Sequence, residues 1–251
     1  MTALPNATSF VAITTPIFSL GEDLIQFIHS NVDQHLVREG MVLAITSKIV
    51  SLAEGRTVPR EQVEKLELIK READVYLGPM GYGSHLTITK GLLLASAGID
   101  VSNSENGDFI LYPVDPFTSA MQLWKTLREK WKIKDLGIIL TDSRTTPLRL
   151  GVTGFALAYW GINGLRRCVG DKDLFGRELK MTSVNVVDGL AAAATLLMGE
   201  AAESRPLVVV HPGGDSHTVL FSDETSPDEL CSTLEDDLYW RALRSGPIGG
   251  S

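Results

Sequence analysis

Apolar residues alternate with polar ones, or run together over a few positions, in several short segments of the chain. Such segments are typical of β-strands when they are rich in β-branched side chains and bounded by turn-forming residues. A hairpin is predicted over 85–96, with its turn near Lys90 and Gly91. Further strands are predicted over residues 41–50, 108–113, 137–140 and 206–211.

Other segments repeat their apolar residues every three or four positions, which predicts amphipathic helices. In the stretch 116–131, a stripe of large apolar residues follows Asp115 as the N-cap and Pro116 at the first helical position. This stripe is typical of a helix that packs on a core. Further helices are predicted over residues 23–36, 60–78, 186–199 and 226–243. The segment 152–162 fits a strand or a helix equally well.

These elements are interspersed without a regular strand–helix–strand rhythm, which favours a mixed α/β (α+β) fold over a doubly wound one. No repeat or low-complexity linker divides the 251 residues. We therefore expect a single unit over 1–251, with two intertwined subdomains as the alternative, and a flexible tail over 244–251.

Composition and charge narrow the class of protein. The chain is 44% hydrophobic and 22% charged, with a formal net charge of -8 and only two cysteines, which is typical of a globular protein and not of a disulfide scaffold. An acidic chain is not expected to bind nucleic acid. The longest apolar run, LAAAATLLM, is too short to span a bilayer, and the N-terminus has no signal-peptide pattern. A cytoplasmic protein without a membrane partner is expected.

Three short stretches place acidic residues directly after apolar runs. Asp100 and Asn103 follow one run, Asp142 and Ser143 follow the strand predicted over 137–140, and Glu200 follows a predicted helix. Magnesium in phosphate chemistry is commonly held by one or two carboxylates together with substrate phosphates. Each stretch alone is better explained as a cap or a turn, because Asp and Asn favour both.

Arg144 and Arg149, on either side of a proline turn, are candidate catalytic residues, because guanidinium groups bind phosphates and carboxylates bidentately. The chain has no G-x-x-x-x-G-K-[ST] motif. The glycines of GPMGYGSH (78–85) have the wrong order and context for a dinucleotide loop. Any nucleotide site is therefore expected to use a different geometry.

The acidic stretches belong to a longer set of motifs that resembles the coenzyme F420-0:L-glutamate ligase family, also called gamma-glutamyl ligases. Their order and spacing match the family from about residue 12 to about residue 210. The resemblance implies the fold of that family, and neither a P-loop nor a Rossmann fold. The motifs are TSKIVSLAEGR (46–56), AGIDVSN (97–103), LTDSRTTPLRLGVTGFALAYWGI (140–162), GDKDLFGRELKMT (170–182) and VVDGLAAAATLLMGE (186–200).

The resemblance implies a ligase that joins an acceptor carboxylate to L-glutamate through an acyl phosphate. It uses GTP or ATP and requires Mg2+ or Mn2+. The implied metal ligands are Asp100, Asp142, Ser143 and Glu200. The implied nucleotide-binding residues are Thr15, Pro16, Ile17, Phe18, Ser47, Lys48, Asn103, Met198 and Gly199. Arg149 matches a family arginine, for which we expect contact with phosphate or a substrate carboxylate.

Two positions depart from the common family pattern. Many members have lysine where this chain has Leu52, and arginine where it has Thr146, for which Arg144 is a candidate replacement. This form looks like a branch associated with folate metabolism, whose expected acceptors are pterins in place of coenzyme F420-0. Lys172, Asp173 and Arg177 also match the family, with an ion pair that braces a loop as the simplest reading for the last two.

Two other functions remain open from the sequence. A non-catalytic nucleotide-binding member of the same fold would keep the carboxylates and lose turnover. A metal-dependent phosphohydrolase would use water in place of glutamate's amine. Because members of the family are dimers, a homodimer is expected.

Overall fold

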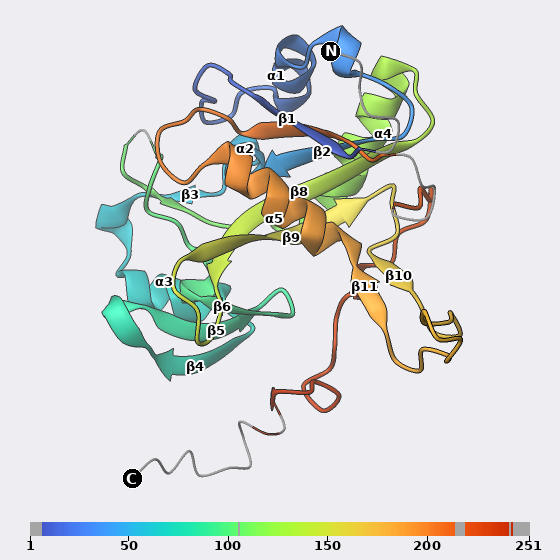
Figure 1. The fold of residues 1–251 in the computed structure, drawn as a ribbon. Coiled ribbons are helices and arrows are strands. Elements are labelled where there is room, and N and C mark those ends of the chain that lie inside the picture. Colours follow the sequence, from blue (N-terminus) through green and yellow to red (C-terminus); the bar gives the residue numbers. More distant parts are fainter. Residues whose placement is uncertain (1–6, 105, 214–218, 241, 243–251) are drawn as a thin grey trace.

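The centre of the molecule is a five-stranded sheet with the strand order β1-β12-β2-β8-β9 (Figure 1). The computed structural model describes residues 7–104, 106–213, 219–240 and 242. Strands β2 and β8 are parallel, and the other neighbouring pairs are antiparallel. The strands are β1 (Ser9–Ile13), β2 (Met41–Thr46), β8 (Leu136–Thr145), β9 (Val152–Trp160) and β12 (Leu207–His211).

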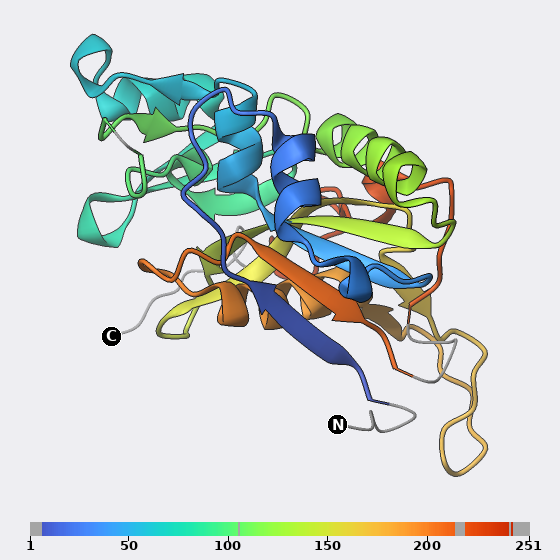
Figure 2. The ribbon, with the colours of Figure 1, turned by 90° about the horizontal axis from the view of Figure 1, so that it is seen from above.

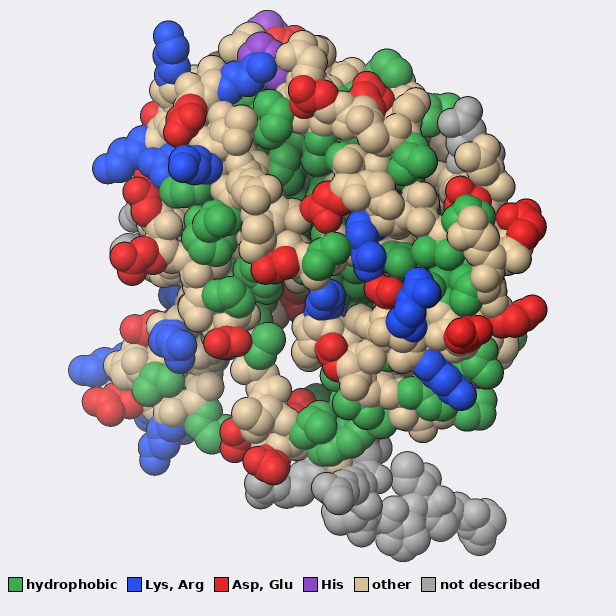
Figure 3. All heavy atoms as spheres, turned by 180° about the vertical axis from the view of Figure 1, so that it is seen from behind, with side chains coloured by type: hydrophobic (Ala, Val, Ile, Leu, Met, Phe, Trp, Pro, Cys, Tyr) green, Lys and Arg blue, Asp and Glu red, His purple; other side chains and the backbone are tan. Residues whose placement is uncertain are grey.

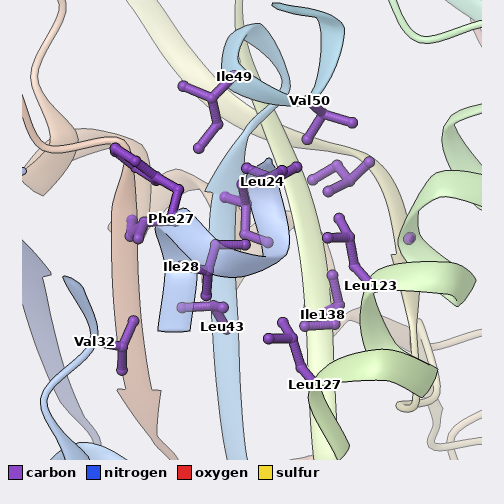
Figure 4. Close-up of a cluster of buried hydrophobic side chains, with 14 of the residues drawn as sticks. Leu24, Phe27, Ile28, Val32, Leu43, Ile49, Val50, Leu123, Leu127 and Ile138 are labelled. Carbon is purple, nitrogen blue, oxygen red and sulfur yellow. The ribbon is translucent and has the colours of Figure 1, made fainter. Parts of the chain in front are cut away.

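Helices cover both faces of this sheet, so β2 is apolar up to Ile45 and β8 is apolar up to Leu140. Figure 2 shows α5 on one side and α1, α2 and α4 on the other. Ile28, Leu43, Leu127 and Ile138 meet in the larger apolar cluster, which is drawn in Figure 4. The helices are α1 (Leu24–Asn31), α2 (Ser47–Ala53), α4 (Pro116–Trp131) and α5 (Val186–Met198).

A smaller lobe lies beside the carboxyl end of β8 (Figure 1). It contains a three-stranded antiparallel sheet, the helix α3 and a separate apolar cluster around Leu68 and Phe109. Its elements are β3 (Thr57–Val58), α3 (Lys65–Glu72), β4 (Val75–Pro79), β5 (His85–Thr89), β6 (Leu92–Ala95) and β7 (Phe109–Ile110).

A hairpin of β10 (Leu165–Arg167) and β11 (Ser183–Asn185) carries a long loop away from the main sheet, as Figure 2 shows. On the face opposite to that of Figure 1, acidic and basic side chains are intermixed (Figure 3). Short 3-10 helices complete the described chain at η1 (Gln34–Leu36), η2 (Arg60–Gln62), η3 (Gly81–Gly83), η4 (Ser96–Gly98) and η5 (Pro227–Glu229).

Several predictions from the sequence are confirmed. The fold is mixed α/β. The hairpin turns at Lys90 and Gly91, which both have the positive φ that a two-residue turn of this kind requires. Helix α4 begins at Pro116, and the Asp115 carboxylate accepts hydrogen bonds from the backbone N–H groups of Phe117 and Thr118. The ambiguous segment 152–162 contains the strand β9.

Two predicted elements were too long, because each was extended past the residue at which the chain changes its secondary structure. The strand predicted over 41–50 ends at Thr46, where helix α2 begins, so Ile49 and Val50 are helical. The helix predicted over 60–78 is shorter. After α3 ends at Glu72, the chain turns back as β4 to pair with β5.

Three further boundaries differ from the predictions. The helix predicted over 23–36 ends at Asn31 and is followed by η1. The strand predicted over 137–140 continues to Thr145, because β9 supplies backbone partners beyond Leu140. The helix predicted over 226–243 is wrong over the described part 226–239, which is η5 followed by turns. The expected flexible tail 244–251 lies outside the described residues.

None of the helices within the described part of the chain has the length and apolar character needed to cross a membrane.

Candidate functional site

The carboxyl half of β8 carries Asp142 and Ser143 within the sheet. A β-bulge interrupts the β8–β9 register between Leu140 and Thr141, directly before the two residues. Bulges are frequent next to active sites, where they change the direction of side chains. The Tyr112 hydroxyl donates a hydrogen bond to Asp142 Oδ2 at 2.5 Å. The polar end of β8 is therefore an ordered part of the sheet and not a solvated turn.

Burial dominates the electrostatics of Asp142. It raises the pKa of this carboxyl above its usual value, although the Tyr112 hydroxyl, the Ser143 backbone N–H and the charge of Lys48 all act in the opposite direction. Burial and the charge of Asp142 together raise the pKa of Tyr112 well above 10, which keeps this hydroxyl protonated as a donor. The fold thus holds Asp142 where its negative charge is incompletely compensated.

Asp100 comes from the small lobe, on the segment that follows η4. Its backbone pairs with Ile110, and one carboxylate oxygen accepts hydrogen bonds from the Ser102 N–H at 2.7 Å and the Ser102 hydroxyl at 2.8 Å. The second oxygen pairs with the ammonium of Lys48. Burial works to raise the pKa of Asp100, but Lys48 and Ser102 outweigh it, so the pKa lies below its usual value.

Lys48 is the basic residue on which the charges of the surrounding carboxylates act. It lies in the first turn of α2, directly after β2, with its side chain about a quarter exposed. Burial alone would lower the pKa of Lys48, but the charges of Asp100, Asp142 and Glu200 raise it above its usual value. Three carboxylates from different elements therefore act on one ammonium group, which stays protonated at neutral pH.

Glu200 follows the carboxyl end of α5, where the sequence placed it. The Ser143 hydroxyl donates a hydrogen bond to Glu200 Oε2 at 3.2 Å, which links α5 to β8. Met198, at the end of the helix, is buried, and the hydroxyl of Thr141 points to its sulfur at 3.5 Å. The structure thus links Ser143 directly to Glu200, and the charges of Glu200, Asp142 and Asp100 all act on Lys48.

The candidate nucleotide-binding residues divide into two groups. Thr15 and Phe18 are buried, with Phe18 packed edge-on against Phe27, whereas Pro16 and Ile17 are exposed. The Thr15 N–H donates to the Ser204 carbonyl at 2.9 Å, so this loop lies beside the segment that begins at Gly199. Ser47 is buried at the start of α2. Asn103 is exposed, with a left-handed φ of 59°.

The two candidate arginines lie in different environments. Arg144 lies over the Phe155 ring, 4.8 Å from its centroid, and its guanidinium is 3.8 Å from Asp188. Arg149 is exposed in the loop that joins β8 to β9 and makes no ion pair with the described residues. Arg144 therefore has partners on β9 and α5, whereas the side chain of Arg149 is exposed to solvent.

The remaining candidate positions lie away from this cluster. Asp173 and Arg177 form an ion pair at 3.9 Å in the loop between β10 and β11, and Asp173 also accepts the Arg177 backbone N–H at 2.8 Å. This pair braces the loop, as the simplest reading of the sequence holds. Leu52 lies in the apolar core, so its side chain does not reach the site.

A divalent cation would find oxygen donors here but no complete cage. Within the described residues, no three His, Cys, Asp or Glu side chains stand close enough together to hold a metal ion. Asp100, Asp142 and Glu200 nevertheless all act on the Lys48 ammonium, and Ser143 adds a hydroxyl oxygen. Hard cations that keep several waters and bind substrate phosphates need only one or two carboxylates. The donor set fits such a cation.

The sequence did not single out two polar residues of the site. Tyr112 lies in a segment that was predicted only as a short apolar strand, although a buried tyrosine hydroxyl usually has a partner. Asp188 occupies the first turn of the apolar helix α5, where it accepts hydrogen bonds from the Ala156 N–H and the Asn185 side chain. In both cases, a single polar residue within an apolar segment was the only signal in the sequence that could have identified the residue.

Comparison with known proteins extends this description. The family described as F420-0:Gamma-glutamyl ligase matches residues 12–212, the part that contains every site residue above. The coenzyme F420:L-glutamate ligase of Methanopyrus kandleri is 38% identical over 211 residues, which are 75% of this chain and 80% of that protein. Its namesake in Archaeoglobus fulgidus is 33% identical over 245 residues, which are 91% of this chain and 94% of that protein.

Proposed function

Since this chain belongs to the F420-0:gamma-glutamyl ligase family, it is a glutamate ligase, and we propose that it forms an amide between an acceptor's carboxylate and the amino group of L-glutamate. A nucleoside triphosphate drives the reaction. The acceptor carboxylate attacks the γ-phosphate to give an acyl phosphate and a nucleoside diphosphate. The glutamate amine then attacks the acyl carbon, and phosphate leaves as the amide forms.

The observation that supports this chemistry is the convergence of three carboxylates on Lys48 at the meeting point of α2, β8, α5 and the small lobe. Phosphoryl transfer depends mainly on positioning and on neutralising charge. We propose that Asp100, Asp142, Ser143 and Glu200 hold Mg2+ or Mn2+. When bound, the cation would neutralise charge on the phosphoryl oxygens.

The residues of the chain itself supply the remaining contacts in this proposal. The Lys48 ammonium, now paired with Asp100, would bind a phosphate oxygen once Asp100 binds the metal cation. The segments at Thr15 and Gly199 lie side by side and form the wall against which GTP or ATP binds. Exposed Arg149, on the loop beyond β8, binds a phosphate or substrate carboxylate, while Arg144 orders the base of that loop.

We propose coenzyme F420-0 as the first acceptor to test, because the relatives above carry that coenzyme in their name. A pterin carboxylate such as dihydropteroate is the alternative. It is motivated by the sequence SRTTPLR, where Thr146 stands in the β8–β9 loop in place of an arginine. In this proposal, the β8–β9 loop contacts the acceptor.

A panel assay tests the reaction. Purified protein is mixed with GTP or ATP, Mg2+ or Mn2+, L-glutamate, and either F420-0 or dihydropteroate, and the product is measured by mass spectrometry. We expect the acceptor to gain glutamate, with nucleotide hydrolysed only when every component is present. Phosphate release without glutamate would identify a phosphohydrolase. Metal-dependent nucleotide binding without any turnover would identify a non-catalytic member.

We further propose that the protein is a homodimer. The loop between β10 and β11 exposes Leu174, Phe175 and Met181, three large apolar side chains that a second copy of the chain would cover. Light scattering at several protein concentrations tests this, and a mass of one chain at all of them would contradict it.

A further inference from the structure

Tyr112 occupies the joint between the two lobes. Its ring is 6% exposed and packs with Leu94 of the small lobe and with Phe155 and Leu157 of the main sheet. These residues form a small apolar cluster of their own, separate from the larger cores on either side. The ring therefore contacts both lobes at once.

Tyr112 contacts two of the three segments that carry the candidate metal ligands. Its hydroxyl donates to Asp142 Oδ2 on β8 at 2.5 Å. Its ring lies against Gly98, two residues before Asp100, so closely that a Cβ added to Gly98 would be 2.1 Å from ring carbons. Gly98 also has a φ of +69°, which side chains disfavour. The ring thus sets how near the Asp100 segment comes to β8.

The backbone of Tyr112 is held as well. Arg56 donates from Nε to the Tyr112 carbonyl at 2.9 Å, and its guanidinium pairs with Glu72 at the end of α3 at 2.6 Å. The Leu111 N–H donates to the Arg56 carbonyl at 2.9 Å. With its ring, hydroxyl and carbonyl all engaged, Tyr112 is held in place from both lobes.

We propose that Tyr112 is a positioning residue that fixes the distance and orientation between Asp100 and Asp142. This inference rests on the proposed function, because it gives Tyr112 the role of orienting two ligands of the proposed cation. The Tyr112 hydroxyl holds Asp142 Oδ2 and so fixes the orientation of this carboxylate. Hydrogen-bond partners that orient a ligating carboxylate commonly account for 10–100-fold in metal affinity or activity.

The test compares two tyrosine-to-phenylalanine variants, each of which loses one hydroxyl group. Tyr112→Phe removes the hydroxyl at the site, and Tyr159→Phe removes a hydroxyl that is bonded to Glu229 at 2.9 Å, in another part of the molecule. Affinity for Mn2+ alone is measured by electron paramagnetic resonance of the free ion. We expect about 10-fold weaker Mn2+ binding for Tyr112→Phe and wild-type binding for Tyr159→Phe.

Turnover gives a second readout that a purely structural role would not move. We expect Tyr112→Phe to need about 10-fold more Mn2+ for half-maximal rate, with the KM for L-glutamate unchanged. Wild-type Mn2+ dependence in Tyr112→Phe, or equal losses in both variants, would overturn the assignment. If Tyr112→Phe does not fold at the assay temperature, both variants and the wild type are compared at a lower temperature, where wild-type Mn2+ binding by Tyr112→Phe again overturns the assignment.

The two proposals fail in different ways. A wild-type protein that neither binds Mn2+ nor makes product would refute the proposed function. A wild-type protein that does both, with Tyr112→Phe matching Tyr159→Phe, would refute only the role of Tyr112.

Discussion

Asp100 and Asp142 lie at one site but come from regions that are built in different ways. Asp100 is on an irregular segment of the small lobe and is paired with a full positive charge, that of Lys48. Asp142 lies within β8 and has a neutral hydroxyl as its hydrogen-bond partner, that of Tyr112. The pKa of Asp100 is accordingly lowered, and the pKa of Asp142 is raised.

The opposite pKa shifts mean that the charged form of Asp100 stabilises the folded state, whereas the charged form of Asp142 destabilises it. A lowered carboxyl pKa means that the charged form is favoured by folding, and a raised pKa means that it is disfavoured. Carboxylates held against the preference of the fold are concentrated at functional sites. Of the two, Asp142 is therefore the better candidate for a group kept for chemistry, and Asp100 serves both the fold and the site.

The largest expected effect is that of Asp142→Asn. The substitution keeps the shape of the side chain and removes the charge that a phosphate-bound cation would need, so we expect turnover to fall by about 100- to 1000-fold, as when a group that stabilises transition-state charge is lost. Because the charge is unfavourable in the fold, the melting temperature should stay the same or rise. A large fall in melting temperature with full Mn2+ affinity would mean that Asp142 is structural.

Lys48→Gln is expected to have the next largest effect. It leaves Asp100 without its charged partner and removes the cation on which Asp100, Asp142 and Glu200 converge. We expect turnover to fall by about 100-fold, and the free energy of unfolding by about 1 kcal/mol, since the pair is partly exposed. Lys130→Gln, on the surface of α4, is the control for loss of a lysine charge. Equal rates for the two variants would show that Lys48 has no role in the reaction.

The same comparison explains how much the sequence could predict. Asp100, Asp142 and Glu200 each followed a clear apolar run, and family motifs joined them into one site. Their partners were less visible, because an apolar strand pattern says nothing about where a tyrosine hydroxyl points. Tyr112 meets Asp142 from 30 residues away, through a contact between two lobes that no local periodicity encodes.

The fold shows the same limit. Local signals placed the start of α4 at Asp115 and the turn at Gly91, because caps and turns depend on adjacent residues. The end of β8 was misplaced at Leu140 since the polar residues that follow continue the strand only because β9 lies beside them. The helix over 60–78 was overextended because Val75 and Leu77 suit a strand as well as a helix, and β5 decides between them.

The two arginines near β8 provide a smaller contrast. Arg149→Lys keeps the charge on an exposed loop but loses the bidentate guanidinium, so we expect turnover to fall by about 10-fold through a higher KM for nucleotide or acceptor. Arg144→Lys loses its stacking on Phe155 and its contact with Asp188, and should lower the melting temperature as well. An unchanged rate for Arg149→Lys would reduce this residue to a solvated part of the loop.

The smallest expected effect is a difference in the pH dependence of stability, measured as melting temperatures in EDTA between pH 3 and pH 8. The raised pKa of Asp142 means that its protonated form favours the fold, so Asp142→Asn should melt higher than wild type at neutral pH, with the gain shrinking as acid protonates the wild-type carboxyl. The lowered pKa of Asp100 means that its contribution is present above the unfolded pKa of about 3.9 and is lost in stronger acid.

Asp100→Asn should therefore melt lower than wild type at neutral pH, and this deficit should shrink below about pH 4. For a chain of this length, each kcal/mol corresponds to about 2–4 °C, so shifts of a few degrees in opposite directions are expected. Shifts of the same sign in both variants would mean that the two carboxylates are compensated alike, and the distinction between a stabilising and a costly carboxylate would then be lost.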